Sequence, residues 1–312
     1  MGFFSVSKDE VEFEDTPFGK GAIVKTPWSD KIEKYLKENQ IQSVHYAPPV
    51  TSSRVKRDIS FLKEFSGLKA LTIATAVESL DPIYNLHNLK SVMLLSYRDE
   101  FEVRFAEFHH LEKCNIYWSE RYSSIFECEN LKCLIISEFK DKGVKRLSKL
   151  KNLESLHITN SPFQDLKEIG GLKKLKNLSF TYLRKLEDLS GLEELSALER
   201  LGFDVCGKVN FETIKEMENL KALSLNDLRK LKSIKFLEKL PNLEDVRIWG
   251  STSILDGDLS VFSKLKKLKE LKIAMRKHYN KLPDNPIILT ALERSEKTSE
   301  ELWKKYWKDH PE

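Results

Sequence analysis

The sequence predicts an α/β fold of the solenoid type, in which short coils stack and each coil adds one strand to a parallel sheet. Three observations predict it. The pattern L-x-x-L-x-L recurs ten times, at intervals of 20 to 25 residues. Within each copy the apolar side chains are separated by a step of three and then a step of two, which fits a turn leading into a strand. The 312 residues, 40% of them apolar and 32% charged, are more than one small core needs, but a solenoid grows by adding coils and stays one elongated domain.

The strand lies in the second half of each copy. In the segment KNLESLHITN, Leu156 and Ile158 are two residues apart and point to one face of a strand, whereas the residues between and beside them point to the other. The apolar residues that follow are mostly three apart, which is typical of short 3-10 segments. Fully burying one such side chain contributes about 1.5 to 3 kcal/mol, so a coil is stable only in a stack. The ten copies begin at Leu68, Leu89, Leu111, Leu131, Leu153, Leu175, Leu198, Leu220, Leu243 and Leu268, and a weaker copy spans residues 41–46.

This pattern resembles the leucine-rich repeat family, whose unit is L-x-x-L-x-L-x-x-N/C-x-L. The resemblance covers residues 41–290, and the period of about 22 is that of the short bacterial and intracellular class. It implies a curved right-handed superhelix with a concave parallel β-sheet, short 3-10 or helical convex segments, and caps at both ends. The expected domains are an N-terminal cap of hairpin and helix (1–40), ten to eleven coils (41–290) and a C-terminal capping helix (291–312).

One position departs from the family pattern. The Asn or Cys of the repeat unit normally lies five residues after the second Leu. Here that position is occupied by Ala76, Tyr97, Ser119, Phe139, Ser161, Leu183, Cys206, Leu228, Ser251 and Arg276. Because buried backbone groups at this turn require hydrogen-bond partners, we expect other residues to supply them and the coil spacing to be uneven.

The two ends of the chain have their own patterns. Alternating apolar residues on either side of TPFGKG within residues 3–28 predict a β-hairpin, and Ser29 is the expected N-cap of a helix over residues 29–40. Thr298 and Glu301 form a T-x-x-E capping box before a helix with an aromatic face. That helix either caps the last coil or binds a partner.

A charged residue follows each first Leu of the repeat. From Lys90 onward the sign alternates at every coil, through Lys90, Glu112, Lys132, Glu154, Lys176, Glu199, Lys221, Glu244 and Lys269. Neighbouring strands lie about 4.8 Å apart, so we expect these charges to pair between coils, each exposed pair contributing less than about 1 kcal/mol.

Function is expected on the outward-facing positions of the strands, which core packing does not constrain. Aromatic, Met and Arg side chains on an otherwise polar face are typical of interface anchors, although some of them pack against neighbours along the sheet. The candidate protein-binding residues are Met93, Tyr117, Trp118, His157, Tyr182, Arg200, Asp204, Asn226, Asp227, Arg247 and Trp249. The longest interval between copies contains residues 250–258, which form either a specificity loop or a tolerated surface insertion.

Residues 264–281 hold eight Lys or Arg against one acid, Glu270. They offer an alternative function, the salt-sensitive binding of a polyanion or nucleic acid, although a net charge of +4 does not by itself favour a nucleic-acid partner. Together with the acidic residues 9–15, they also suggest weak head-to-tail self-association.

Catalytic, metal and membrane motifs are not found in the sequence. There is no nucleophile elbow, no H-E-x-x-H and no glycine-rich dinucleotide motif, so we expect neither catalysis nor a cofactor. His109 and His110 are interpreted as surface residues rather than metal ligands, and carboxylates such as Asp204 on an open surface are expected to keep nearly normal pKa values. Four cysteines make no disulfide framework, and without a signal peptide or membrane span the chain is expected to be cytoplasmic. The predicted function is a non-enzymatic protein-interaction module of unknown partner: an adaptor, a regulator or an immunity-type protein, of bacterial origin if the resemblance holds.

Overall fold

The computed structural model describes residues 6–49, 56–95, 101–207 and 209–280. They fall into two compact units, which divide within the repeats between residues 115 and 116 and are described separately. The C-terminal capping helix predicted for residues 291–312 lies outside the described residues. Thirteen strands follow one another in chain order in one sheet, from β1 to β11 and then β13 and β15, while β12 pairs with β14 in a second, small sheet. This open, mainly parallel sheet confirms the predicted solenoid fold.

Unit 1 begins with the hairpin and helix that the sequence predicts. Strands β1 (Val11–Thr16) and β2 (Gly19–Val24) pair antiparallel, and α1 (Asp30–Glu38) is capped by the Ser29 hydroxyl, which accepts a hydrogen bond from the backbone N–H of Ile32 at 3.4 Å. The next strands run parallel to β2. They are β3 (Ser43–Tyr46), β4 (Ala70–Ile73) and β5 (Ser91–Leu94), with 3-10 segments η1 (Ser60–Glu64), η2 (Asp81–Asn85) and η3 (Phe105–Glu107). Strand β6 (Lys113–Tyr117) contains the boundary between the units.

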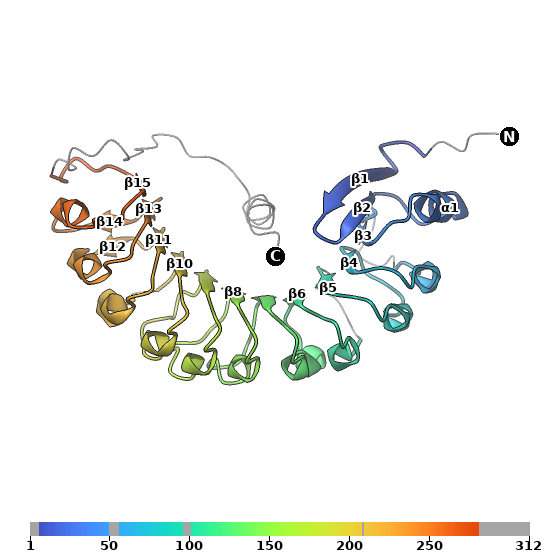
Figure 1. Ribbon diagram of the computed structural model, residues 1–312, viewed down its shortest axis with the longest axis horizontal. Coiled ribbons are helices and arrows are strands. Elements are labelled where there is room, and N and C mark those ends of the chain that lie inside the picture. Colours follow the sequence, from blue (N-terminus) through green and yellow to red (C-terminus); the bar gives the residue numbers. More distant parts are fainter. Residues whose placement is uncertain (1–5, 50–55, 96–100, 208, 281–312) are drawn as a thin grey trace. The chain divides into compact units, whose positions relative to one another are not determined.

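Unit 2 repeats one strand and one 3-10 segment. Its main strands are β7 (Cys133–Ser137), β8 (Ser155–Thr159), β9 (Asn177–Thr181), β10 (Arg200–Asp204), β11 (Ala222–Asn226), β13 (Asp245–Trp249) and β15 (Glu270–Ile273). The 3-10 segments are η4 (Glu120–Glu127), η5 (Leu147–Lys149), η6 (Ile169–Gly171), η7 (Leu192–Glu194), η8 (Phe211–Glu216), η9 (Lys235–Lys239) and η10 (Ser260–Ser263). Within this unit the strands line the inner side and the 3-10 segments the outer side (Figure 1).

The core of unit 2 consists of rows of apolar side chains in register. One row contains Leu134, Leu156, Leu178, Leu201, Leu223 and Val246, and the next contains Ile136, Ile158, Phe180, Phe203, Leu225 and Ile248. Every member of both rows is at most 2% exposed. The step of two between Leu156 and Ile158 therefore has the meaning that the sequence predicts: alternate strand residues fill successive slices of one interior.

The residue directly after each of the strands β7 to β11 and β13 has a left-handed backbone, a feature that the sequence analysis does not predict. Glu138, Asn160, Tyr182, Val205 and Asp227 have φ between 49° and 58°, and Gly250 has φ 66°. The N–H of the first five donates to the carbonyl of the last residue of the next strand, at 2.8 to 3.2 Å. This turn therefore joins each coil to the next.

Other side chains replace the missing Asn ladder, as expected. The buried Thr252 hydroxyl donates to Leu225 O at 2.9 Å and accepts from Leu228 N at 3.0 Å. The Cys206 thiol lies 3.6 Å from Phe180 O, and Arg276 Nη2 donates to Gly250 O at 2.5 Å. The backbone carbonyls at this turn therefore receive hydrogen bonds from a different side-chain type in each of these coils.

A ladder of asparagine side chains does exist at another position, immediately before the first Leu of a repeat. Asn88, Asn152, Asn219 and Asn242 each donate through Nδ2 to a backbone carbonyl of the preceding coil, at 2.7 to 3.1 Å. The N-L dipeptide in these copies is the sequence signal that would have revealed it.

The predicted charge ladder is confirmed at four steps. Lys90 pairs with Glu112 at 3.0 Å within unit 1. In unit 2 the pairs are Lys176–Glu154 at 2.8 Å, Lys221–Glu199 at 2.9 Å and Lys269–Glu244 at 2.6 Å. These side chains are largely solvent-exposed, so each pair stabilises only modestly.

Residues 250–258 are a packed part of the coil, not a surface insertion. They contain β14 (Ser253–Ile254), which pairs parallel with β12 (Lys230–Leu231). Thr252 and Ile254 are completely buried. The longer interval in the sequence therefore accommodates a second short strand on another side of the coil.

Replacing Glu154 by Lys tests the charge ladder. The substitution removes the pair with Lys176 and places like charges in one row, so we expect the melting temperature to fall by a few degrees at low salt, about 1 kcal/mol, and by less at high salt. The control is Glu216→Lys at the exposed end of η8. Thermal unfolding at 20 mM and 500 mM salt (about a fivefold change in screening length) measures both; an equal fall at the two salt concentrations contradicts the ladder.

Replacing Val205 by Asn tests the left-handed turn. A β-branched residue at φ 51° is strained, whereas Asn tolerates this conformation, so Val205→Asn should raise stability by about 1 kcal/mol. Gly250→Ala should do the opposite, because a Cβ there would meet the Asp227 carboxylate at 2.4 to 2.5 Å. Chemical denaturation measures both changes, and destabilisation by Val205→Asn would show that its isopropyl contacts outweigh the strain.

Candidate functional site

The outward face of the sheet in unit 2 presents three rows of side chains, fixed by the strand register. The first row is Cys133, Ser155, Asn177, Arg200, Ala222, Asp245 and Glu270; the second is Ile135, His157, Ser179, Gly202, Ser224, Arg247 and Lys272; the third is Ser137, Thr159, Thr181, Asp204, Asn226 and Trp249. We call this surface the sheet face. It brings together seven of the predicted binding residues, at or directly after strands β9, β10, β11 and β13: Tyr182, Arg200, Asp204, Asn226, Asp227, Arg247 and Trp249.

Side chains in the middle of the sheet face project little beyond the backbone because they are small. Ser179, Gly202 and Ser224 are neighbours in the second row. A Cβ on Gly202 would meet only the Cβ atoms of these two serines, at 3.5 and 3.9 Å, so the space above the glycine is open. A partner group can approach the backbone here. Sequence reasoning identified both serines as small polar positions but missed Gly202, whose importance follows from the register.

Charges at one edge of the sheet face neutralise one another. Arg247 bonds both carboxylate oxygens of Asp245, at 2.8 and 3.2 Å, and its guanidinium lies 3.7 Å from Glu270. Lys272 pairs with the other oxygen of Glu270 at 2.5 Å. Arg247 is therefore held in a network and is less available as an anchor than its sequence position suggests.

Two further carboxylates on the same face, those of Asp204 and Asp227, have no such cation in the described part of the chain. Burial raises the pKa of Asp204, and the charge of nearby Asp227 raises it further. The expectation of a nearly normal pKa is therefore wrong for Asp204, because the side chain is half-buried in its row and not open to water. Asp227 accepts a hydrogen bond from Ser251 N at 2.8 Å.

Two aromatic residues, the half-buried Trp249 and the exposed Tyr182, lie beside these carboxylates. Trp249 ends β13 and is next in register to Asn226. Tyr182 follows β9, its side chain is 46% exposed, and the Arg184 guanidinium lies 5.9 Å from its ring. The left-handed backbone of Tyr182 places the ring at the carboxyl edge of the sheet.

Trp118 is not an exposed anchor, and that prediction is wrong. The side chain is 8% exposed and packs between Phe126 and Phe139, with ring centroids at 5.4 and 5.0 Å and the Arg146 guanidinium at 4.8 Å. It follows β6 at the position that is left-handed in the next five coils, but Trp118 itself is not left-handed. Its side chain therefore belongs to the core.

His157 lies on the sheet face but is buried, so its prediction as an exposed anchor is also wrong. Nδ1 lies 2.5 Å from Ser179 Oγ, and Nε2 lies 2.9 Å from Thr159 Oγ1. Burial lowers the pKa of His157 to about 4, so the ring is neutral at physiological pH. Tyr117 ends β6 and is half-buried, and Met93 lies in β5 of unit 1, in register with Thr72, so neither belongs to the group on β9–β13.

The basic segment is largely paired with the preceding coil. Lys264 bonds Glu238 at 2.8 Å, Lys267 bonds Asn242 Oδ1 at 2.5 Å and Lys269 bonds Glu244 at 2.6 Å. Lys264 and Lys269 are thereby ion-paired with acids of the preceding coil, whereas Lys267 contacts a neutral amide; the structure gives the polyanion alternative no support.

Unit 1 contains a depression of about 610 Å³ with Trp28, Tyr46 and Phe61 among its lining residues. Three of its four acids are engaged: Glu33 and Glu64 both bind Lys37, and Asp58 accepts from the hydroxyl of Ser60 at 2.7 Å. Burial raises the pKa of Tyr46. This arrangement is explained by the packing of the first coil.

Metal and membrane features are not seen in the described part of the chain. No group of three or more His, Cys, Asp or Glu in residues 6–49, 56–95, 101–207 and 209–280 could hold a metal ion. No helix of the described residues is long and apolar enough to cross a membrane. Burial raises the pKa of Cys128 to about 12 and of Cys206 to about 11, so both thiols stay protonated and unreactive.

The buried His157 predicts a specific loss of stability in acid. Its folded pKa of about 4 is below the ordinary 6.5, so the unfolded chain binds more protons between these values and stability falls as the pH drops through this range. We expect a loss of about 2 kcal/mol from this group between about pH 7 and pH 5, measured by denaturant unfolding. His157→Gln should flatten the profile, and the exposed His87→Gln should not; an unchanged profile in His157→Gln contradicts the assignment.

Comparisons with known proteins agree with the fold. No protein-family model matches the sequence, and no curated protein matches it. An internalin (inlF) of Listeria monocytogenes matches in structure with 19% identity over 81% of this chain and 73% of its own, at a TM-score of 0.59. A chain of the Toll–Spatzle complex of Drosophila matches with 13% identity over 88% of this chain and 43% of its own, at a TM-score of 0.61. A leucine-rich-repeat protein of Leptospira interrogans matches with 22% identity over 74% of this chain and 66% of its own, at a TM-score of 0.45. With its repeat period, its parallel sheet and its 3-10 return segments, the chain is a leucine-rich-repeat solenoid.

Proposed function

We propose that this chain is a non-enzymatic protein-binding module and that the sheet face of unit 2 contacts the partner. One observation carries the proposal. On strands β9 to β13, the side chains that point inward form a closed core, whereas those that point outward are half-buried or exposed and include Tyr182, Arg200 and Trp249. Nothing in the packing of the coil requires such large side chains on that face.

The composition of the sheet face supports a protein partner. Trp, Tyr and Arg are the residues that most often dominate binding energy in protein interfaces, and here they surround a low strip of Ser and Gly. The strands are held by their ladders, so a partner would meet a surface that is already ordered and would lose little entropy in fixing it. The chain of the Toll–Spatzle complex, similar in fold, comes from an assembly of two proteins.

Other features fit the proposal without deciding the biological role. All four cysteines are free thiols, which is the state that a reducing cytoplasm maintains. We propose a cytoplasmic, bacterial adaptor, regulator or immunity-type protein, bounded by caps at residues 1–40 and 291–312. Two of the five acidic residues in 9–15 form ion pairs within unit 1: Glu10 binds Lys31 and Glu12 binds Lys25. We therefore do not propose head-to-tail self-association.

An affinity capture from native lysate tests the proposal. Immobilised wild-type protein is compared with a Tyr182→Ala, Arg200→Ala, Trp249→Ala variant, after circular dichroism shows that both are folded. We expect a protein to be retained by the wild type and reduced at least tenfold on the variant, because these side chains supply the anchors.

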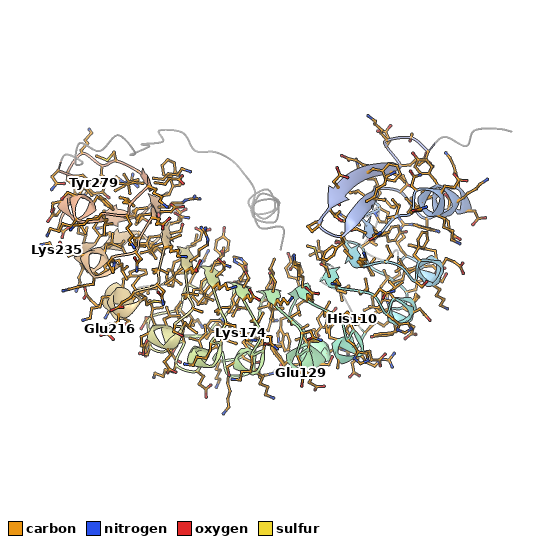
Figure 2. The ribbon with its side chains drawn as sticks, viewed as in Figure 1. His110, Glu129, Lys174, Glu216, Lys235 and Tyr279 are labelled. Atoms are coloured by element: carbon orange, nitrogen blue, oxygen red, sulfur yellow. The ribbon has the colours of Figure 1, made fainter. Side chains whose placement is uncertain are left out.

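The matched control carries the same number of alanine substitutions at exposed positions that do not belong to the sheet face, Lys174, Glu216 and Lys235, which are labelled in Figure 2. It should retain the partner as the wild type does. Equal retention by all three proteins would place the binding site elsewhere and overturn the proposal.

A further inference from the structure

Within the sheet face, Asp204 and Asp227 form an acidic pair that has no counter-charge among the described residues. Asp204 ends β10, and Asp227 directly follows β11, the neighbouring strand. Burial raises the pKa of Asp204, and the charge of the nearby Asp227 raises it further. Among the described residues no Lys, Arg or His pairs with either carboxylate, whereas Asp245 and Glu270 on the same face are both paired. The two carboxylates therefore add uncompensated negative charge to this surface.

The backbone holds the second carboxylate in place. Asp227 has a left-handed backbone with φ 49°, and its side chain extends over the next coil, where Oδ1 accepts from Ser251 N at 2.8 Å. Gly250 leaves room for it, since any Cβ at that position would overlap the carboxylate. The charge is thus directed by the fold and does not depend on a freely rotating side chain.

Asn226, which lies between Asp204 and Trp249, adds a hydrogen-bond acceptor that has no donor among the described residues. Asn226 is the neighbour of Asp204 on one side and of Trp249 on the other. Its Nδ2 donates to Ser224 Oγ at 3.0 Å, which leaves Oδ1 with no donor although that atom is buried. A buried acceptor without a donor costs free energy, and an incoming N–H group would remove that cost.

The indole ring of Trp249 provides the remaining component of the candidate site. Within the described residues, Trp249 has no aromatic or cationic partner on its ring, in contrast to Trp118 and Trp28. Neighbouring strands are about 4.8 Å apart, so a planar cation placed above Asn226 lies within reach of both Asp204 and the Trp249 ring. Ser224 and Gly202 in the next row are small enough to let a side chain reach this point.

From this arrangement we propose that the partner inserts an arginine side chain between Asp204 and Trp249. The inference rests on the proposed function and names the chemistry that the sheet face recognises. A guanidinium group carries five N–H donors in one plane, so it bonds the carboxylates and the Asn226 oxygen while its face stacks on the indole. A lysine ammonium offers no plane to stack and fewer directed donors, which makes it the weaker ligand.

Short peptides test this on the full chain. The probes are acetyl-Gly-Arg-Gly-amide, the same peptide with lysine, and the same peptide with citrulline, which is similar in shape to arginine but uncharged. Binding is followed by NMR through the indole N–H signal of Trp249, assigned by its loss in Trp249→Phe. We expect the arginine peptide to bind at least tenfold more tightly than the citrulline peptide and several-fold more tightly than the lysine peptide.

Two variants locate the site. Asp204→Asn and Asp227→Asn should each weaken the arginine peptide about tenfold, and Glu216→Gln, which removes one exposed charge from η8, should leave it unchanged. Equal binding of the arginine and citrulline peptides overturns the inference, as does equal binding to Asp204→Asn and Glu216→Gln. Circular dichroism of each variant excludes loss of folding as the cause.

The capture experiment separates this inference from the proposed function. If the partner is lost on the Tyr182, Arg200 and Trp249 variant but retained by Asp204→Asn, the arginine assignment fails and the binding face stands. If every variant retains the partner, the binding face itself fails. Loss of the partner on Asp204→Asn, with retention on Glu216→Gln, supports both.

Discussion

The structure depends on backbone hydrogen bonds between successive coils, made at both ends of each strand. At the entry, one carbonyl accepts two N–H groups of the next coil: Glu154 O accepts from Lys176 at 2.9 Å and from Asn177 at 3.0 Å, and Lys176 O accepts from Glu199 and Arg200 in the same way. At the exit, a left-handed residue donates to the following strand. Because both ends are fixed, the register cannot slip by one residue, a shift that would turn every core side chain outward.

The side-chain ladders follow from that register. The residue whose carbonyl accepts at the entry is the charged residue after the first Leu, so Glu154 and Lys176 are carried to within 2.8 Å of each other by the backbone. Their attraction favours the correct register but is too weak to create it. The asparagine ladder before the first Leu and the mixed partners of the turn, such as Thr252, complete the polar contacts between coils. Their variety shows that the fold requires satisfied carbonyls and not one residue type.

The same register decides which outward side chains become a surface. It places Asp204 next to Asn226 and Asn226 next to Trp249, although the members of each pair are more than twenty residues apart along the chain. It also places Arg247 beside two acids, which compensate its charge. Two uncompensated carboxylates, an unused acceptor and the half-buried Trp249 ring therefore lie together at one part of the face, where the arginine site is proposed.

The sequence by itself determined the period, the inward rows, the N-terminal hairpin and helix, and the pairing of charges, because each is set by spacing along the chain. It also placed Tyr182, Asp204 and Trp249 on the outward side. Only the tertiary structure decided that Trp118 is a core residue and that His157 is buried and neutral, since exposure depends on the backbone conformation at one turn and on neighbours from other coils. Only the tertiary structure decided which carboxylates have no neighbouring cation, because ion pairing depends on the positions of the charges in space.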